Sequence, residues 1–269
     1  MKYELKNLAG DLAAHIKTVD EDTYTPHKSA GLRSAAKPAA APAAAEKTAA
    51  VSAAQKPVPA AAPADISAGM AALIAEMKKC RKCQLGHARL NAVFGVGNTR
   101  AEVVFVGEGP GFEEDHRGEP FVGRSGALLD KILETVLGLK RSDVYIANIV
   151  KCHPMKDPEA PEAHGNDRPP TPEEISACRP YLDKQLALIK PRCIVTLGSV
   201  ATKVLLGVTQ GISLIRGKWY DYPVELFGPD KHIKVLPTYH PAALLRNPNL
   251  KRDTWEDMKM LKAFLEEKA

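Results

Sequence analysis

The sequence predicts an α/β fold: a three-layer α/β/α arrangement with a mostly parallel, central four-stranded sheet, preceded by a disordered N-terminal extension. Two observations lead to this fold class. Short apolar runs alternate with helical patterns through residues 65–269, which is typical of βαβ units. Polar residues follow several of these runs directly, and ligands of parallel sheets bind beyond the carboxyl ends of the strands.

The first 64 residues are predicted to lie outside this domain. Residues 1–24 carry apolar side chains at three- and four-residue steps, namely Leu5, Leu8, Leu12 and Ile16. This spacing indicates a short amphipathic helix, which is either a frayed tail or a docking segment for a partner protein. Residues 25–64 are predicted to be a disordered linker, because the stretch 34–64 is dominated by Ala and Pro and contains no aromatic and almost no large aliphatic side chain.

Within residues 65–269, short apolar runs predict four strands, at 102–106, 144–150, 193–197 and 233–237. Patterns with one apolar face predict five helices, at 66–79, 125–139, 172–190, 199–206 and 252–267. The third helix has a clear start, because Thr171 can cap it, Pro172 suits its first position and Glu174 can close a capping box. Residues 219–227 are predicted as a hairpin and residues 113–126 as a loop.

Composition and charge narrow the class of protein. The 37 Lys and Arg residues against 32 Asp and Glu give a net charge of +5, which is too even for a polycation. Nucleic-acid binding would therefore depend on a few well-placed groups. No apolar run is long enough to span a membrane, and the N-terminus lacks the pattern of a secretory signal peptide. We expect a cytoplasmic, nucleoid-associated protein without membrane contact.

The five cysteines indicate a ligand set. Cys80 and Cys83 have the two-residue spacing that lets both thiolates bind one metal centre. Cys152 follows a predicted strand and Cys178 lies in the next helix, whereas Cys193 lies inside an apolar strand and is expected to be inert. Four thiolates suit zinc or an iron–sulfur cluster, and the spacing alone does not decide between these and ordinary thiols.

The other polar groups follow predicted strands. The stretch GEGPG at 107–111 is no dinucleotide fingerprint because Phe112 stands where a glycine is required, but its glycines allow close backbone approach to a ligand. Phe121 can fill the core or stack on a flat ring. His240 can pack in a turn or donate a hydrogen bond to an oxygen that gains charge.

Taken together, residues from about 66 to 269 resemble the family 4 uracil-DNA glycosylases, the iron–sulfur members of the uracil-DNA glycosylase superfamily. The matching stretches are GEGPGFEEDHRGEPFVGRSGALLDKIL, YIANIVKCHP, TPEEISACRPYL, TLGSVA, RGKWY and YHPAALLRNP. Their order and length make the resemblance specific. None of residues 1–64 takes part in it.

The resemblance implies an enzyme that flips uracil out of DNA and hydrolyses its N-glycosidic bond, leaving an abasic site for base excision repair. It implies a [4Fe–4S] cluster held by Cys80, Cys83, Cys152 and Cys178. It implies the following site residues: Gly107, Glu108 and Gly109 around the uracil and the attacking water, Phe121 stacked on the base, Asn148 on its polar edge, His240 donating to O2, and Leu244 filling the gap in the duplex. Because Gly109 offers no carboxylate, Glu108 and Glu114 are the candidates for activating the water.

Two departures from the family pattern stand out. Ala242 replaces a serine whose hydroxyl could hold a DNA phosphate, and the segment between Cys152 and Cys178 is longer than typical. The matched pocket motifs contain no lysine suited to a Schiff base, so we expect a monofunctional hydrolase. We also expect the protein to be a monomer. The alternatives are a non-catalytic iron–sulfur DNA-binding protein of the same fold and a zinc-bound structural module.

Overall fold

The computed structural model describes residues 66–222 and 233–267. The expectations for residues 1–24 and 25–64 fall outside these ranges, as does the second half of the hairpin predicted at 219–227. None of the helices in the described ranges combines the length and the apolar character needed to cross a bilayer.

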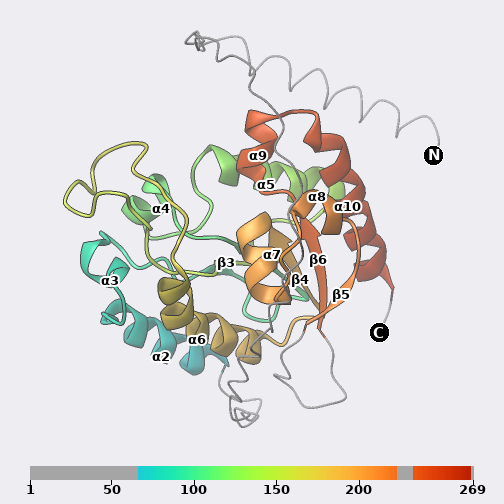
Figure 1. The fold of residues 1–269 in the computed structure, drawn as a ribbon. Coiled ribbons are helices and arrows are strands. Elements are labelled where there is room, and N and C mark those ends of the chain that lie inside the picture. Colours follow the sequence, from blue (N-terminus) through green and yellow to red (C-terminus); the bar gives the residue numbers. More distant parts are fainter. Residues whose placement is uncertain (1–65, 223–232, 268–269) are drawn as a thin grey trace, which may run out of the picture. The chain divides into compact units, whose positions relative to one another are not determined.

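A six-stranded sheet forms the centre of the domain, in the order β1-β3-β2-β4-β6-β5 (Figure 1). The strands span Val96–Gly97 (β1), Val103–Gly107 (β2), Tyr145–Asn148 (β3), Cys193–Leu197 (β4), Tyr220–Asp221 (β5) and Lys234–Thr238 (β6). The four inner strands are parallel, which confirms the predicted sheet. The two outer strands are antiparallel to their neighbours, and β5 occupies the start of the predicted hairpin. At two residues each, the outer strands are too short to show an alternating pattern in the sequence.

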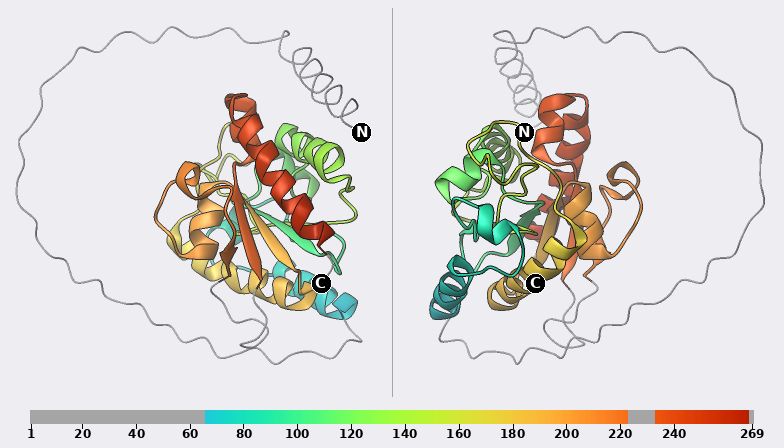
Figure 2. Two further views of the ribbon diagram at one scale, coloured as in Figure 1. Left: turned by 90° about the vertical axis from the view of Figure 1, so that its right-hand side faces the viewer. Right: turned by 60° about the vertical axis from the view of Figure 1, so that its left-hand side comes forward.

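Helices cover both faces of the sheet, as the α/β/α prediction requires. They span Ile66–Lys78 (α2), Leu85–Ala88 (α3), Phe112–Arg117 (α4), Arg124–Ile132 (α5), Pro172–Ile189 (α6), Ser199–Leu206 (α7), Ile212–Ile215 (α8), Pro241–Arg246 (α9) and Leu250–Glu266 (α10), with a π-helical turn, η1, at Leu133–Leu137. Figure 2 shows α2 and α6 on one side of the sheet and α5 and α10 on the other.

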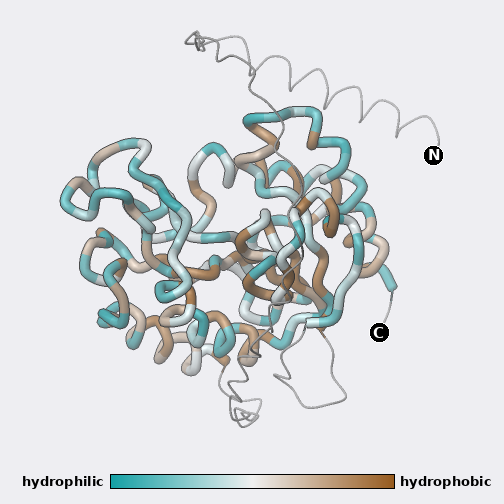
Figure 3. Tube along the Cα trace, viewed as in Figure 1, coloured by the Kyte–Doolittle hydropathy of each residue, from teal (hydrophilic) through white to brown (hydrophobic). Residues whose placement is uncertain are grey.

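The alternation of side chains along each strand divides the core in two. Val104 and Val106 of β2 belong to the cluster beneath α2, α6 and α7, whereas Val103 and Phe105 belong to the cluster beneath α5, η1 and α10. Both faces of the strand are therefore buried, which explains why its sequence is continuously apolar (Figure 3).

The start of α6 follows the sequence prediction closely. The Thr171 hydroxyl accepts a hydrogen bond from the Glu174 N–H at 3.3 Å, and the Glu174 carboxylate accepts one from the Thr171 N–H at 2.8 Å. This capping box fixes the helix that carries Cys178.

Helices α4 and α9 are not among the helices that the sequence predicts. Helix α4 takes up the acidic part of the stretch at 113–126, and α9 follows His240 directly. Each has six residues, less than two turns, so neither produces a helical period that stands out from its flanks. Both lie beyond the carboxyl ends of the parallel strands, where they shape the pocket described next.

Candidate active site

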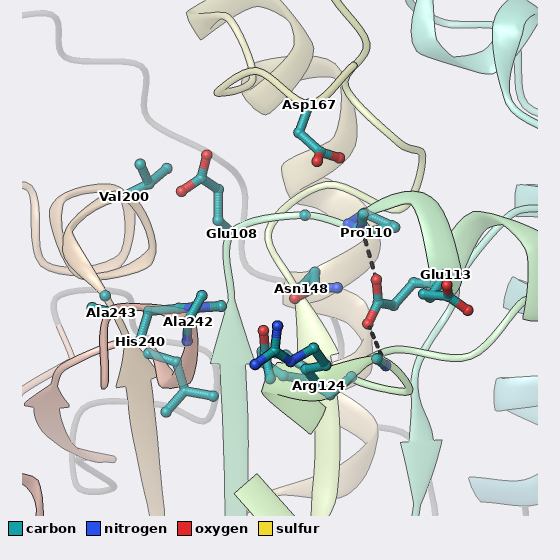
Figure 4. Close-up of a pocket in the computed structure, with 18 of the residues that line it drawn as sticks. Glu108, Pro110, Glu113, Arg124, Asn148, Asp167, Val200, His240, Ala242 and Ala243 are labelled. Carbon is teal, nitrogen blue, oxygen red and sulfur yellow. Dashed lines mark hydrogen bonds between the residues drawn. The ribbon is translucent and has the colours of Figure 1, made fainter. Parts of the chain in front are cut away.

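A pocket of about 1030 Å³ opens at the carboxyl ends of the four parallel strands (Figure 4). Each strand contributes a lining residue at or just after its end: Glu108 from β2, Asn148 from β3, Gly198 from β4 and His240 from β6. The prediction that these strand exits converge is therefore confirmed.

The amide of Asn148 is the most unusual group in the pocket. The residue is 1% exposed, and within the described residues neither its Nδ2 nor its Oδ1 has a hydrogen-bond partner. Leaving a buried amide unpaired costs about 1–3 kcal/mol for each group. A ligand with a complementary donor and acceptor would satisfy both atoms.

Gly107 leaves room for this amide and for the Phe121 ring. A Cβ atom at residue 107 would lie 2.4 Å from Asn148 Oδ1 and 2.6 Å from the Cζ atom of Phe121. A Cβ at Gly109 would similarly lie 2.8 Å from a methyl group of Val150. These two glycines are therefore required by close packing around the pocket floor.

Phe121 is held in a strained backbone conformation. Its φ of 54° lies in the left-handed region, which is unusual for a residue other than glycine, and its side chain is 5% exposed. The ring lies 5.4 Å from the imidazole of His240, measured between ring centroids, with a tilt of 32°. The structure thus brings together Phe121, Asn148 and His240, the three side chains expected to contact a flat base.

His240 is the N-cap of α9, and its Nδ1 accepts a hydrogen bond from the Ala242 N–H at 3.1 Å. An acceptor nitrogen carries no proton, so in the neutral ring the proton is on Nε2. Burial, with a smaller contribution from the Arg246 charge, lowers the pKa of His240 from 6.5 to about 4. The imidazole is therefore neutral at pH 7 and has one N–H left to donate.

Glu108 and Glu114 both line the pocket, but they are placed very differently. Burial raises the pKa of Glu108, and no hydrogen-bond partner of its carboxylate is found within the described residues. The Glu114 carboxylate accepts three backbone hydrogen bonds, from the N–H groups of Gly111 at 3.1 Å, Val122 at 3.0 Å and Gly123 at 3.2 Å. Glu114 thus ties the loop after β2 to the segment that follows Phe121.

Glu114 therefore holds two backbone segments together, a structural role that was not predicted from the sequence. The sequence suggested that Glu114 could activate a water or bind a substrate. The backbone engages both of its carboxylate oxygens, which places it badly for either role. Nothing in the sequence pattern indicates such a brace, because its three partners are backbone groups.

The structure places Leu244, the residue expected to fill the gap in the duplex, in the core. Its side chain is 1% exposed, so it cannot enter a base stack without leaving the core. The next residue, Leu245, is 38% exposed. Because α9 starts at Pro241, its helical phase turns Leu244 inward and Leu245 outward, and the sequence alone did not fix that phase.

The four candidate ligand cysteines surround a second, much smaller cavity of about 10 Å³. Cys80, Cys83, Cys152 and Cys178 all line it, whereas Cys193 is buried in β4. Two sulfur atoms accept hydrogen bonds, Cys152 Sγ from the Arg89 guanidinium at 3.0 Å and Cys178 Sγ from the backbone N–H of Lys151 at 3.2 Å. Arg89 and Lys151 both line this cavity.

Four sulfur donors beside two cationic residues fit an anionic metal–thiolate group better than a purely structural cluster of thiols. In residues 66–222 and 233–267, however, no three Cys, His, Asp or Glu side chains adopt the arrangement of a formed metal site.

Lys151, which was not anticipated from the sequence, lines the smaller cavity and contacts the backbone of Asn148, a residue that lines the larger one. It is fully buried, and its Nζ donates to the Asn148 carbonyl at 2.9 Å and to Gln185 Oε1 at 2.6 Å. Its backbone N–H holds Cys178, as described above. A single residue therefore contacts both the chain at the unpaired amide and one of the thiols.

Comparison with known proteins gives a consistent result. A family model described as the uracil DNA glycosylase superfamily matches residues 94–259. The chain is 44% identical over 191 residues to the type-4 uracil-DNA glycosylase of Sulfurisphaera tokodaii, covering 70% of this chain and 80% of that protein. It is 42% identical over 197 residues to the type-4 uracil-DNA glycosylase of Saccharolobus solfataricus, covering 72% and 85%. It is 44% identical over 193 residues to that of Archaeoglobus fulgidus, covering 70% and 89%.

Proposed function

The chain belongs to the uracil-DNA glycosylase superfamily, and from this premise we propose that it removes uracil from DNA by hydrolysing the N-glycosidic bond, leaving free uracil and an abasic site. The observation that carries the proposal is the buried amide of Asn148, whose polar atoms have no partner within the described residues and face the same pocket as His240. A pyrimidine edge offers the donor and acceptor that this amide lacks.

A base stacked in a duplex cannot reach this pocket, so the nucleotide must rotate out of the helix, at a cost of about a few kcal/mol. The pocket, at about 1030 Å³, has room for the base together with its sugar and the adjoining backbone. The Phe121 ring offers a flat surface for the everted base to stack on.

Asn148 would select uracil by polarity. Its Oδ1 can accept from the N–H of the uracil edge while its Nδ2 donates to the neighbouring carbonyl. Cytosine presents the opposite polarity at these positions, so binding it would leave the buried amide unpaired. This mismatch is the physical basis of the proposed discrimination.

His240 would stabilise the leaving group. As the glycosidic bond breaks, the uracil takes up the bonding electrons and negative charge develops on its O2 oxygen. The neutral imidazole, with Nδ1 occupied by the Ala242 N–H, can donate from Nε2 to that oxygen. One such donor is worth about 3 kcal/mol in the transition state.

Glu108 would orient or deprotonate the attacking water, since its carboxylate lines the pocket and no hydrogen bond engages it within the described residues. The residues that line the described pocket include no lysine. We therefore infer direct attack by water and no Schiff base, which makes the proposed enzyme monofunctional.

Cys80, Cys83, Cys152 and Cys178 would hold a [4Fe–4S] cluster. The four sulfur donors and the neighbouring Arg89 and Lys151 support this assignment, because thiolate clusters carry negative charge. When bound, the group would cross-link the segment before β1, the end of β3 and α6. We assign it no role in bond breaking.

The proposal is tested by incubating the purified protein with a uracil-containing oligonucleotide and then treating the DNA with hot alkali. We expect strand scission at the uracil and release of free uracil. An oligonucleotide with cytosine or thymine at the same position is the control. A protein that binds the uracil strand but produces no alkali-sensitive site would contradict the proposed function.

A further inference from the structure

Four arginines line the pocket. Two of them, Arg117 and Arg168, form ion pairs with acidic residues, and the other two are Arg124 and Arg246. Arg168 is bound by Glu174 through two hydrogen bonds, of 2.8 and 2.7 Å, and Arg117 lies 3.5 Å from Glu113. For Arg124 and Arg246 the described part of the chain provides no hydrogen bond, ion pair or ring contact. These two guanidinium groups are free to bind a ligand.

The acidic residues of the pocket do not neutralise them. The Asp167 carboxylate is bound to His153 at 2.7 Å, Glu113 is paired with Arg117, and the backbone engages Glu114. In Figure 4 the Glu108 carboxylate is directed toward Val200, away from Arg124. Among the described residues, the pocket therefore presents two unpaired cations, and the Glu108 carboxylate points away from Arg124.

The two arginines come from neighbouring helices on one wall of the pocket. Arg124 is the first residue of α5 and Arg246 the last of α9, and these helices lie side by side in Figure 1. His240 caps the start of α9 and Arg246 ends the same six-residue helix, and both residues line the pocket. Both cations are thus close to where the base and its backbone would enter.

We propose that Arg124 and Arg246 bind phosphate groups of the DNA strand on either side of the everted uracil. This inference rests on the proposed function. Uracil itself is neutral and offers nothing to two cations, whereas a nucleic-acid strand brings one negative charge per nucleotide to the pocket entrance. The planar guanidinium binds a phosphate through two parallel hydrogen bonds.

A second feature supports phosphate binding by these arginines. Residue 242 lines the pocket next to His240 but is alanine, so it has no hydroxyl to offer a phosphate. Charge supplied from Arg246, one turn further along α9, would take over that contact. Arg124 would hold the strand from the neighbouring helix.

The test compares the variants Arg124→Gln and Arg246→Gln with Arg117→Gln, a matched control whose guanidinium is already paired. Excision and binding are measured on a single-stranded uracil oligonucleotide over a range of salt concentrations. Each lost phosphate contact should flatten the plot of log affinity against log salt by about 0.7. We expect this change in the first two variants, with KM raised about tenfold and kcat unchanged, and no change in Arg117→Gln.

Two further measurements separate phosphate binding from a structural effect. Arg124→Lys keeps the charge but not the paired hydrogen bonds, so it should retain the wild-type salt dependence while raising KM. Oligonucleotides with one neutral methylphosphonate linkage locate the contact. At the linkage that Arg124 binds, wild type and Arg124→Gln should become equally active, and the same holds for Arg246 at another linkage.

Salt dependence equal to wild type in both glutamine variants would overturn the proposal, as would a loss confined to kcat at saturating DNA. Anisotropy of labelled DNA, measured in parallel, separates the two levels of inference. A wild-type protein that binds but excises nothing contradicts the proposed function. The phosphate assignment is then decided by the salt dependence of binding alone.

Discussion

The Ala242 N–H donates to Nδ1 of His240, and this single hydrogen bond at 3.1 Å leaves Nε2 as the ring nitrogen that is available to a ligand. Protonation at Nδ1 would remove the acceptor and break the turn that starts α9. The bond and the burial of the ring therefore both favour the neutral form with its proton on Nε2.

The first prediction concerns pH. The pKa of His240 is about 4 in the folded protein against 6.5 for an exposed histidine, so the unfolded chain takes up a proton first as the pH falls. The free energy of unfolding should decrease from about pH 6.5 down to about pH 4, and less so in His240→Gln. Thermal melts of both proteins across this range provide the measurement; equal slopes would contradict a buried neutral ring.

The same residue has a predicted effect on excision. His240→Gln should reduce kcat by about 10²–10³ with little change in DNA binding. The wild-type rate should show no inflection near pH 6.5 and should fall only on the acid side, where Glu108, with its raised pKa, adds to the loss. Single-turnover rates at several pH values test both statements.

The second prediction is that the Asn148 amide is needed for excision but lowers the stability of the fold. Replacing the unpaired buried amide with an apolar side chain of similar size, Asn148→Leu, removes a desolvation cost of about 1–3 kcal/mol. The variant should melt at a higher temperature than wild type and excise no uracil. A lower melting temperature would mean that the amide has a partner in solution.

The third prediction uses the space around Gly107. Gly107→Ala places a methyl group 2.4 Å from Asn148 Oδ1 and 2.6 Å from the Phe121 ring. Excision should be lost, because the Phe121 ring and the Asn148 amide cannot both keep their positions beside this methyl group. Gly211→Ala is the matched control, since the nearest atom to a Cβ there is 4.0 Å away. Uracil release by the two variants, compared in one assay, decides the point.

The fourth prediction separates two adjacent leucines. Leu244→Ala should destabilise the fold by about 2–5 kcal/mol, as expected of a fully buried leucine. Leu245→Ala should leave the melting temperature nearly unchanged and lower excision from duplex DNA more than from single strands, since only a duplex has a gap to fill. Equal losses on both substrates would argue against a wedge at Leu245.

The fifth prediction concerns the thiols. Cys178→Ala should reduce the iron and acid-labile sulfide that purify with the protein, together with the visible absorbance of a cluster. Cys193→Ala, also a buried cysteine but in β4, should keep wild-type iron content. Iron analysis of the two variants is the measurement. Equal iron in both would remove Cys178 from the ligand set.

Much of the fold could be predicted from local sequence. The strand at 193–197 and the helix at 199–206 have the predicted bounds, because a continuous apolar run ends at Gly198 and an amphipathic stretch begins there. The capping residues at Thr171 and Glu174 likewise fix the start of α6 through contacts three residues apart. Such features depend on neighbours in the chain.

The parts that could not be predicted depend on contacts between distant segments. The roles of Glu114 and Lys151 are set by backbone groups of other elements, and the orientation of Leu244 by the phase of a six-residue helix. The unpaired state of Asn148 is a property of the assembled pocket. The sequence could place Glu114, Asn148 and Leu244 near the site but could not assign their contacts, and nothing in it singled out Lys151.

The position of Lys151 has one more consequence. Only three residues separate Asn148 from Cys152. The Lys151 amine, one of the three, donates to the Asn148 carbonyl and to Gln185 of α6, the helix that also carries Cys178. A displacement of this helix would therefore also move the backbone at Asn148, so the thiol cavity and the larger pocket are mechanically connected.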